Sequence, residues 1–430
     1  MSARTGVMIF FVAFVTRVMI GWRSFLSPAA AHTNDSFAYR QLADELLHGR
    51  FPSLFRTPGY PLFLALTGGF PESTLVSTLL VQTVLDSVTA VMVAAIAWRL
   101  WSDPWAARLA GLLYAICPVS ATLCSMVMTE TLFIFLTVVA LFLGLCRQTS
   151  LSLIAQALCW SAATLTRPSG VLLPFIVGFF LIIRQAKPDK FRQAIVLGLY
   201  TLIISMWVGF NYRRVGTPIL CSLPAVTVYM YELPAVRMAD QLSWLDYTRL
   251  WIFNPREAER IRQVYEKDFV QEVFARSGAI PPDLWTTIDD PYAIHRLKAE
   301  ADLQLQDRLP ARIGIHLVGA LQILRPISPS APGGVIATIV DGLRLLLLPV
   351  ALMVLARRQQ WWLLSLFAVW FSYTLFLPGV NGIWRFRSMA EPILSLVLAA
   401  GATGLFIQGR VYRSLRNEID SGLRKQEGQQ

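Results

Sequence analysis

Long apolar runs separated by short polar connections occupy most of the chain. A helix of about 20 residues crosses the hydrocarbon core of a bilayer, and about ten runs approach that length. They lie at 6–26, 74–98, 105–123, 127–146, 150–166, 169–184, 193–212, 335–356, 361–378 and 388–408. The pattern therefore predicts an all-α polytopic membrane protein with about ten spans.

The first run, Gly6 to Leu26, is followed by small residues that resemble a signal-peptide cleavage site. Arg17 and Arg23 interrupt the run, whereas the apolar region of a signal peptide rarely carries charge. We therefore expect a retained anchor helix.

Two longer polar segments separate the apolar runs, at 28–72 and 213–334. In the first, Ala38, Leu42 and Leu46 recur at helical spacing. This spacing predicts an amphipathic helix on the membrane surface, and Gly49 is a suitable residue just beyond its C-terminus.

The second polar segment contains charge-rich amphipathic stretches at Asn254 to Ala275 and at Tyr292 to Arg308, which predict a small helical cap. Within it, the apolar stretch Ile313 to Leu324 is expected to form an interfacial helix. The predicted parts are an N-terminal transmembrane catalytic module at 1–212 (with its first outer loop at 28–72), an extracytoplasmic helical segment at 213–334, C-terminal transmembrane helices at 335–408 and a cytoplasmic tail at 409–430.

Composition supports a membrane protein and excludes several other classes. Hydrophobic residues make up 55% of the chain, charged residues 15%, and the mean hydropathy is +0.52. A soluble domain carries roughly 25% charged residues, so an ordinary soluble enzyme, a disordered chain and a fibrous protein are excluded. The net charge of +11 is expected to reflect loops held at the cytoplasmic face, and no nucleic-acid partner is expected.

Basic clusters in the short loops predict the orientation, because such loops stay on the cytoplasmic side. The clusters are Arg99 with Arg108, Arg147, the run from Arg184 to Arg192, Arg357 with Arg358, and the tail from Arg410 to Lys425. All fall on one side if there are ten spans and both termini are cytoplasmic. The localisation expected from this is a bacterial inner (plasma) membrane, with the site on the extracytoplasmic face.

The cysteines and histidines provide no recognisable metal or disulfide pattern. The five cysteines are scattered without any CxxC spacing, so a disulfide framework and a zinc site are not predicted. His295 and His316 have no second ligand at metal-binding spacing.

Several charged residues lie at outer ends of the predicted spans, where insertion disfavours positive charge. They are Arg56, Glu130, Arg167, Arg385 and Arg387. Ionisable groups at this depth usually face a cavity, and a guanidinium binds phosphate or carboxylate in a bidentate fork. The alternatives are contact with lipid headgroups, or pairing within the protein such as Arg387 with Glu391 on one helical turn.

Asp35 precedes the amphipathic helix of the first outer loop. One reading makes Asp35 or Ser36 the N-cap of that helix. The other places the Asp35 carboxylate beside the arginines, where it takes a proton from an acceptor hydroxyl. Both readings can hold together.

The order of these motifs resembles the GT-C membrane glycosyltransferases. The most similar group is family 39, which includes protein O-mannosyltransferases, the lipid A aminoarabinose transferase and bacterial relatives acting on lipopolysaccharide core. The similarity covers about 1–212 and 335–408. It rests on the anchor helix, Asp35, Tyr39, Arg56-Thr57-Pro58-Gly59-Tyr60-Pro61, Met128-Thr129-Glu130, Thr166-Arg167-Pro168, Trp384-Arg385-Phe386-Arg387 and Glu391-Pro392.

The resemblance implies a GT-C-type transmembrane bundle and a polyprenyl-monophosphate sugar donor. It implies that Asp35 is the general base of an inverting transfer to an acceptor hydroxyl, on a lipid-linked glycan or a protein. Arg385 and Arg387 would bind the donor phosphate with help from Arg56 and Arg167. Tyr39, Tyr60 and Glu130 would contact the substrate. Ser36 stands where some relatives carry a second acid, so a divalent metal ion stays open and no other cofactor is expected.

Two other functions remain as alternatives. A transporter or flippase of lipid-linked sugars would share the apolar groove and the basic contacts, but no repeat relates the two halves of the sequence. An O-antigen polymerase or ligase would use a diphosphate-linked donor, which demands more phosphate contacts than the late Arg385–Arg387 loop offers.

Overall fold

A computed structural model describes residues 1–404 apart from 51–53, 70–74, 147–148, 185–186, 276–290, 329 and 378–383. Arg147 and the predicted tail at 409–430 lie outside the described residues. Within the described residues all regular secondary structure is helical, which confirms the predicted all-α class.

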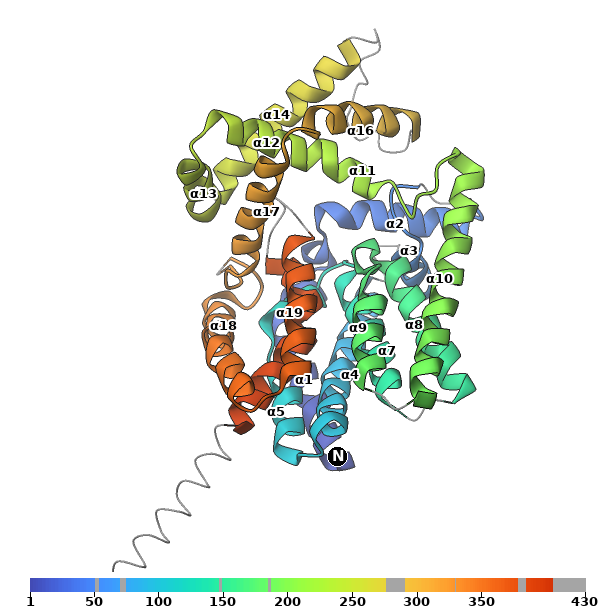
Figure 1. The fold of residues 1–430 in the computed structure, drawn as a ribbon, viewed down its shortest axis with the longest axis vertical. Coiled ribbons are helices and arrows are strands. Elements are labelled where there is room, and N and C mark those ends of the chain that lie inside the picture. The colour runs from blue at the N-terminus through green and yellow to red at the C-terminus, as the bar shows by residue number, and fades with distance from the viewer. Residues whose placement is uncertain are drawn as a thin grey trace, which may run out of the picture.

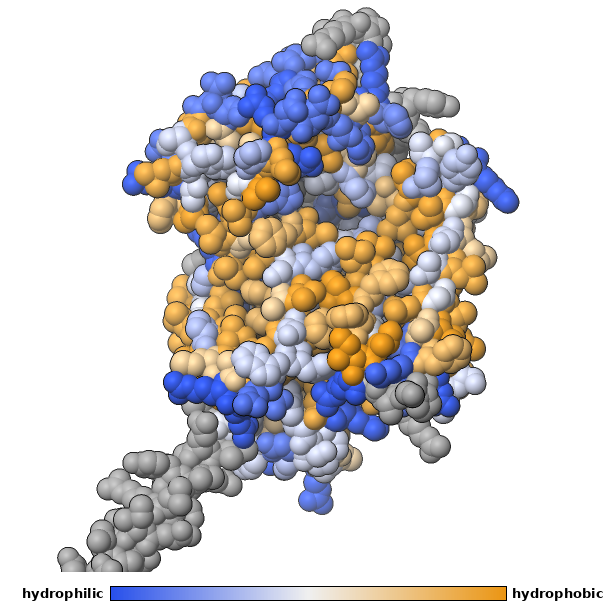
Figure 2. Space-filling view, in the orientation of Figure 1, coloured by the Kyte–Doolittle hydropathy of each residue, from blue (hydrophilic) through white to orange (hydrophobic). Residues whose placement is uncertain are grey.

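Long apolar helices form a bundle whose outer surface is an apolar band (Figures 1 and 2). Among the residues that the structure describes, four helices are long and apolar enough to cross a membrane: α1 (Ala3–Leu26), α4 (Leu75–Trp101), α10 (Lys187–Val215) and α18 (Gly334–Arg357). Shorter apolar helices pack among them: α7 (Glu130–Leu145), α8 (Ser150–Thr166), α9 (Leu173–Arg184) and α19 (Trp361–Phe376). The chain is an integral membrane protein, and its span count of ten stays a prediction.

Two predicted spans have a different local structure. The run at 105–123 was expected to be one helix, but it divides into α5 (Pro104–Ala115) and α6 (Pro118–Leu123). Pro118 has no N–H for an intrahelical hydrogen bond and its ring clashes with the preceding turn, so it starts a new helix. The run at 388–408 begins inside a 3₁₀ segment, η6 (Trp384–Ala390), which continues as a helix over 391–404.

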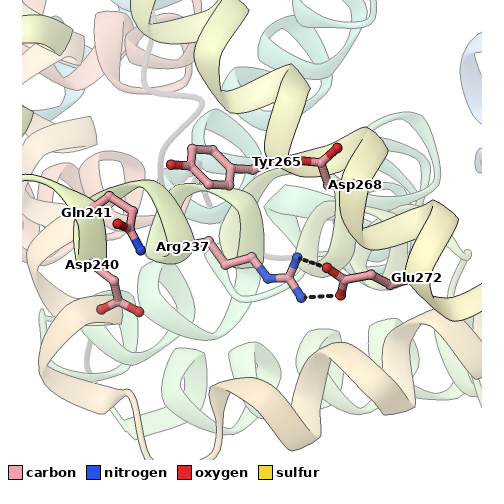
Figure 3. A pocket seen from close by; sticks show the side chains of 6 residues that line it. All are labelled: Arg237, Asp240, Gln241, Tyr265, Asp268 and Glu272. Carbon is pink, nitrogen blue, oxygen red and sulfur yellow. Dashed lines mark hydrogen bonds and ion pairs between the residues drawn. The ribbon is translucent and has the colours of Figure 1, made fainter.

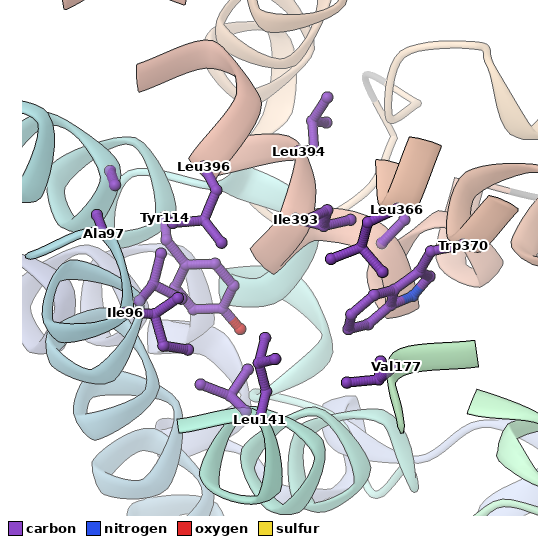
Figure 4. Close-up of a cluster of buried hydrophobic side chains, with 14 of the residues drawn as sticks. Ile96, Ala97, Tyr114, Leu141, Val177, Leu366, Trp370, Ile393, Leu394 and Leu396 are labelled. Carbon is purple, nitrogen blue, oxygen red and sulfur yellow. The ribbon is translucent and has the colours of Figure 1, made fainter. Parts of the chain in front are cut away.

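The core of the bundle joins the two ends of the sequence (Figure 4). Tyr114 and Leu141 from the N-terminal half lie buried with Ile393 and Trp370 from the C-terminal half. The indole of Trp370 also donates a 3.1 Å hydrogen bond to the carbonyl of Met389. This contact fixes η6 against α19 and so positions the arginines that η6 carries.

The helix α2 (Asn34–Leu47) lies across one end of the bundle, beneath the helices that come between α10 and α18 in the chain (Figure 1). Its first turn is fixed by a capping box between Thr33 and Ser36, and Gly49 follows its end with φ +66°, a conformation that glycine adopts without strain. The predicted amphipathic helix and its end near Gly49 are therefore confirmed.

The helices between α10 and α18 gather above this end of the bundle, with a hydrophilic outer surface (Figures 1 and 2). They pack around their own apolar core, which includes Tyr229, Phe269 and Leu297. The helices are α11 (Leu223–Thr227), the π-helix η4 (Val228–Glu232), α12 (Leu233–Gln241), α13 (Trp244–Phe253), α14 (Pro255–Ala275), α16 (Pro291–Leu305) and α17 (Leu309–Ile323). We call this group the cap.

The stretch expected to be an interfacial helix is most of α17, which runs from the cap to the bundle (Figure 1). Its Arg312 pairs with Glu232 of the cap. Its His316 ring nitrogen Nδ1 lies 2.9 Å from the carbonyl of Phe376, at the end of α19. The helix therefore ties the rest of the cap to the bundle; its place in a bilayer stays a prediction.

Gly59 opens α3 (Gly59–Thr67) at a close contact with the end of α8. A Cβ at Gly59 would lie 2.7 Å from backbone atoms of Leu165 and Thr166. The absence of a side chain thus lets the loop that carries Arg56 approach Arg167.

We expect Gly59→Ala to lower the free energy of unfolding by about 1–3 kcal/mol, because the rigid backbone of α8 must move away. Thermal unfolding in detergent measures the change. Gly198→Ala is the matched control, since its Cβ would meet nothing within 4 Å. Equal melting temperatures for both variants would contradict the close contact.

Candidate functional site

Asp35 lies in the first turn of α2, the helix at the end of the bundle that faces the cap (Figure 1). Thr33 is the N-cap, so the Asp35 side chain is not used for capping. The hydroxyl of Ser36 donates to the carbonyl of Val127 at 3.0 Å, and this bond docks the start of α2 onto the chain just before α7. Asp35 is therefore held in place while its carboxylate remains partly exposed.

Arg56 contacts Asp35 from the loop that leads into α3. Its Nη2 atom lies 2.7 Å from Oδ1 of Asp35. The guanidinium carbon lies 4.5 Å from the ring centre of Phe55 and 5.0 Å from that of Tyr39. These aromatic faces orient the guanidinium without consuming its N–H donors.

Arg385 reaches the same carboxylate from the other end of the sequence. Its Nη1 atom lies 3.1 Å from Oδ2 of Asp35, across a sequence separation of 350 residues. Phe386 lies between two arginines, with its ring centre 5.1 Å from the Arg385 guanidinium carbon and 5.2 Å from that of Arg167. The η6 segment thus carries both the Arg385 charge and the Phe386 ring that lies between Arg385 and Arg167.

Glu130 and Arg167 form a further ion pair beside the two ion pairs of Asp35. The Nη1 atom of Arg167 lies 2.7 Å from Oε1 of Glu130, which is fully buried at the start of α7. The Nε atom of Arg385 lies 3.9 Å from the same oxygen. Arg167 also donates to Thr129 and Ser169, at 3.0 and 3.1 Å. These ion pairs form one cluster, which we call the arginine–carboxylate cluster: Asp35, Arg56, Glu130, Arg167 and Arg385.

Tyr39 and Tyr60 form the aromatic side of this cluster. Their ring centres lie 5.1 Å apart in an edge-to-face arrangement. The Tyr60 hydroxyl donates to Oε1 of Gln82 at 2.8 Å. Gln82 is not among the residues predicted from the sequence, although a polar residue inside the apolar run of α4 was a usable signal.

Gln82 holds three parts of the chain together. While it accepts the Tyr60 hydroxyl, its amide nitrogen donates to the carbonyls of Cys124 and Met126, at 3.0 and 2.9 Å. It thereby fixes α3 and α4 to the segment that leads to Glu130.

Arg387 lies in a different place from the other predicted site residues. Its Nε atom lies 3.0 Å from Oε1 of Glu391, its Nη2 atom pairs with Asp341, and it is fully buried. Arg344 lies 2.8 Å from the other Glu391 oxygen. The structure thus contains the internal Arg387–Glu391 pair that the sequence analysis gave as an alternative. Arg387 does not join the arginine–carboxylate cluster.

The charge around Asp35 changes its acidity. Burial alone would raise the pKa of its carboxyl group, but Arg56 and Arg385 outweigh this effect and hold the pKa below its ordinary value. Asp35 is therefore a carboxylate at neutral pH, and a weak base while both arginines contact it.

Both arginines keep unused donors. The Nε atoms of Arg56 and Arg385 are buried and have no hydrogen-bond partner. An unpaired buried N–H costs about 1–3 kcal/mol, and more in a charged group. Two such donors on guanidiniums that already meet at one carboxylate are suited to a further anion.

The residues present do not fit a divalent cation. Both Asp35 oxygens are bound by arginine, and in the part of the chain that the structure describes no three His, Cys, Asp or Glu side chains converge. We derive no chemical step through a metal.

A separate cavity of about 240 Å³ lies on the cap (Figure 3). Its Arg237 guanidinium is bound in a fork by Glu272, at 2.8 and 3.3 Å. The other lining residues are Asp240, Gln241, Tyr265 and Asp268. None of the predicted site residues lines this cavity.

Residues 56–210 match the family described as dolichyl-phosphate-mannose-protein mannosyltransferase. This region contains Arg56, Tyr60, Glu130 and Arg167. No curated protein matches the sequence.

One solved structure of similar fold is the archaeal oligosaccharyltransferase AglB from Archaeoglobus fulgidus, in complex with an inhibitory peptide and a dolichol-phosphate. The TM-score is 0.50 at 13% identity, and the match covers 96% of this chain and 52% of AglB. The chain thus spans about half the length of that relative.

ArnT from Cupriavidus metallidurans also matches, in two states. The form bound to undecaprenyl phosphate has 15% identity and a TM-score of 0.39, and the apo form has 17% and 0.37. Each match covers 94% of this chain and 78% of ArnT. The family match and the fold of AglB confirm the expected resemblance to the GT-C membrane glycosyltransferases.

Proposed function

We propose that this membrane protein of GT-C glycosyltransferase type transfers a sugar from a polyprenyl-monophosphate donor to an acceptor hydroxyl. The observation that carries the proposal is the meeting of Asp35 with Arg56 and Arg385, whose buried Nε donors make no hydrogen bond. The family match over 56–210 and the AglB fold support the same class of reaction. The acceptor is a lipid-linked glycan or a protein.

In the proposed reaction the acceptor oxygen attacks the anomeric carbon as its proton passes to the Asp35 carboxylate. The bond between that carbon and the phosphate oxygen breaks, and the polyprenyl phosphate leaves with the electron pair. One displacement inverts the anomeric centre and needs a single carboxylate, unlike the two-carboxylate retaining route.

The negative charge that develops on the leaving phosphate requires fixed cations. We assign this role to Arg385 and Arg56, with Arg167 held nearby by Glu130. Tyr39 and Tyr60 line the same place and would contact the sugar or the phosphate. Arg387 is assigned to holding η6, in place of the expected phosphate contact, because its guanidinium is already paired with Asp341 and Glu391.

The basic loops support a site on the extracytoplasmic face, with both termini cytoplasmic and the protein in a bacterial inner membrane. The apolar band on the outer surface of the bundle supplies a surface for the donor lipid (Figure 2).

Arg385→Ala is expected to raise the donor concentration needed for half-maximal transfer by about tenfold or more, since a charge-assisted hydrogen bond to an anion is worth about 1.5–3 kcal/mol. Ser388→Ala, three residues further along the same segment, should leave it nearly unchanged. Transfer measured against donor concentration tests this. Equal effects would mean that Arg385 contacts only lipid headgroups.

A further inference from the structure

We propose that Asp35 competes with the donor phosphate for the same arginines, so that donor binding releases the base from an inhibited state. The inference rests on the proposed function and concerns regulation of that site. In the free protein the Asp35 carboxylate is paired with the two arginines that the phosphate needs. The same ion pairs make the carboxylate a weaker base.

The geometry of the ion pairs carries the first step. Arg56 binds one oxygen of Asp35 at 2.7 Å, and Arg385 binds the other at 3.1 Å. The two guanidiniums come from the loop before α3 and from η6, so the carboxylate joins two separate segments. Each of those guanidiniums has a buried Nε donor that makes no hydrogen bond, so the hydrogen-bonding capacity of the two arginines is not fully used.

The surrounding charges favour exchange of one anion for another. Glu130 lies 3.9 Å from Nε of Arg385 and is bound at 2.7 Å to Arg167. Tyr39 from α2 lies against Arg56. The groups that face Asp35 are therefore two arginines in direct contact, with a tyrosine and a second arginine–glutamate pair behind them. A phosphate that enters this cluster meets guanidiniums that are already close together, and it must displace the Asp35 carboxylate from them.

Proton affinity gives the consequence for catalysis. The arginines hold the pKa of Asp35 below its ordinary value, and a general base works best when its pKa is closer to the working pH. A phosphate that shares Arg56 and Arg385 weakens both ion pairs and adds a nearby negative charge, and each change raises the proton affinity of the carboxylate. Donor binding therefore precedes effective deprotonation of the acceptor.

Binding of undecaprenyl phosphate to the full-length protein in lipid nanodiscs tests the proposal. We expect Asp35→Asn to bind this lipid about tenfold or more tightly than the unchanged protein, because removing one negative charge a few ångströms from a phosphate strongly favours the complex. Asp35→Ser, which also removes the charge, should bind more tightly as well. The control is Asp44→Asn on the same helix, where the carboxylate pairs with His48 and Arg50 instead.

The outcomes separate the two proposals. Tighter binding by both Asp35 variants, with no change in the Asp44 variant, supports competition. Equal or weaker binding by folded Asp35 variants would overturn the proposed competition, while the proposed phosphate site would be unaffected. Failure of all four proteins to bind the lipid phosphate would reject the proposed function together with this inference.

Discussion

Asp35→Asn is expected to lower sugar transfer by about 10²–10⁴-fold, the usual contribution of a positioned general base. The amide has the size of the carboxylate but does not take up a proton from the acceptor hydroxyl. The contacts of residue 35 with Arg56 and Arg385 are weakened, yet the capping box at the start of α2 and the Ser36–Val127 hydrogen bond remain. The protein should therefore fold and still bind lipid phosphate.

Mass spectrometry of membrane glycolipids and glycans, in cells that carry only the variant, measures the loss. Asp44→Asn controls for a general effect of removing a carboxylate from α2. Transfer at the normal level in the Asp35 variant would remove this residue from the mechanism and leave the arginines as lipid contacts.

Arg387→Ala is expected to act on the fold instead. The side chain is fully buried between Asp341 and Glu391, and it also donates to the carbonyls of Ile323 and Arg325, at 3.1 and 3.0 Å. Removing one partner of a buried ion pair leaves an uncompensated charge and costs about 3–5 kcal/mol. We expect a much lower melting temperature and poor yield.

Arg99→Ala is the matched control, because Arg99 is an exposed arginine near the end of α4. Thermal unfolding of the purified variants in detergent compares them. A stable Arg387→Ala protein with a specific defect in donor binding would return Arg387 to the phosphate site.

The different fates of Arg385 and Arg387 show a limit of the sequence argument. Both lie in one short motif, and the sequence placed both at the phosphate. The motif forms a 3₁₀ segment, in which each residue turns by about a third of a circle, so residues two apart point in different directions. Only the conformation of the segment shows that Arg385 lies in the candidate site and that Arg387 is buried in the fold.

Other features of the site could be predicted from the spacing of apolar residues and from the side of the membrane on which the loops lie. The helix after Asp35 and its end near Gly49 follow from local periodicity, and the meeting of Asp35 with Arg385 was expected from the common side of their loops. Gln82 was missed because its partners, Tyr60 and two carbonyls, are distant in sequence. The break at Pro118 was missed because an apolar run of sufficient length was read as one helix.

The first helix has a consequence for how the protein is made. Arg17 is fully buried in α1, and its Nε atom lies 2.8 Å from Asp86 of α4. An arginine near the middle of an isolated helix opposes insertion by about 2.5–3.5 kcal/mol, and its neutralising partner is synthesised 69 residues later. During translation, the pairing that offsets this cost becomes available only after α4 has been synthesised, so α1 gains its full stability in the bilayer when the two helices come together.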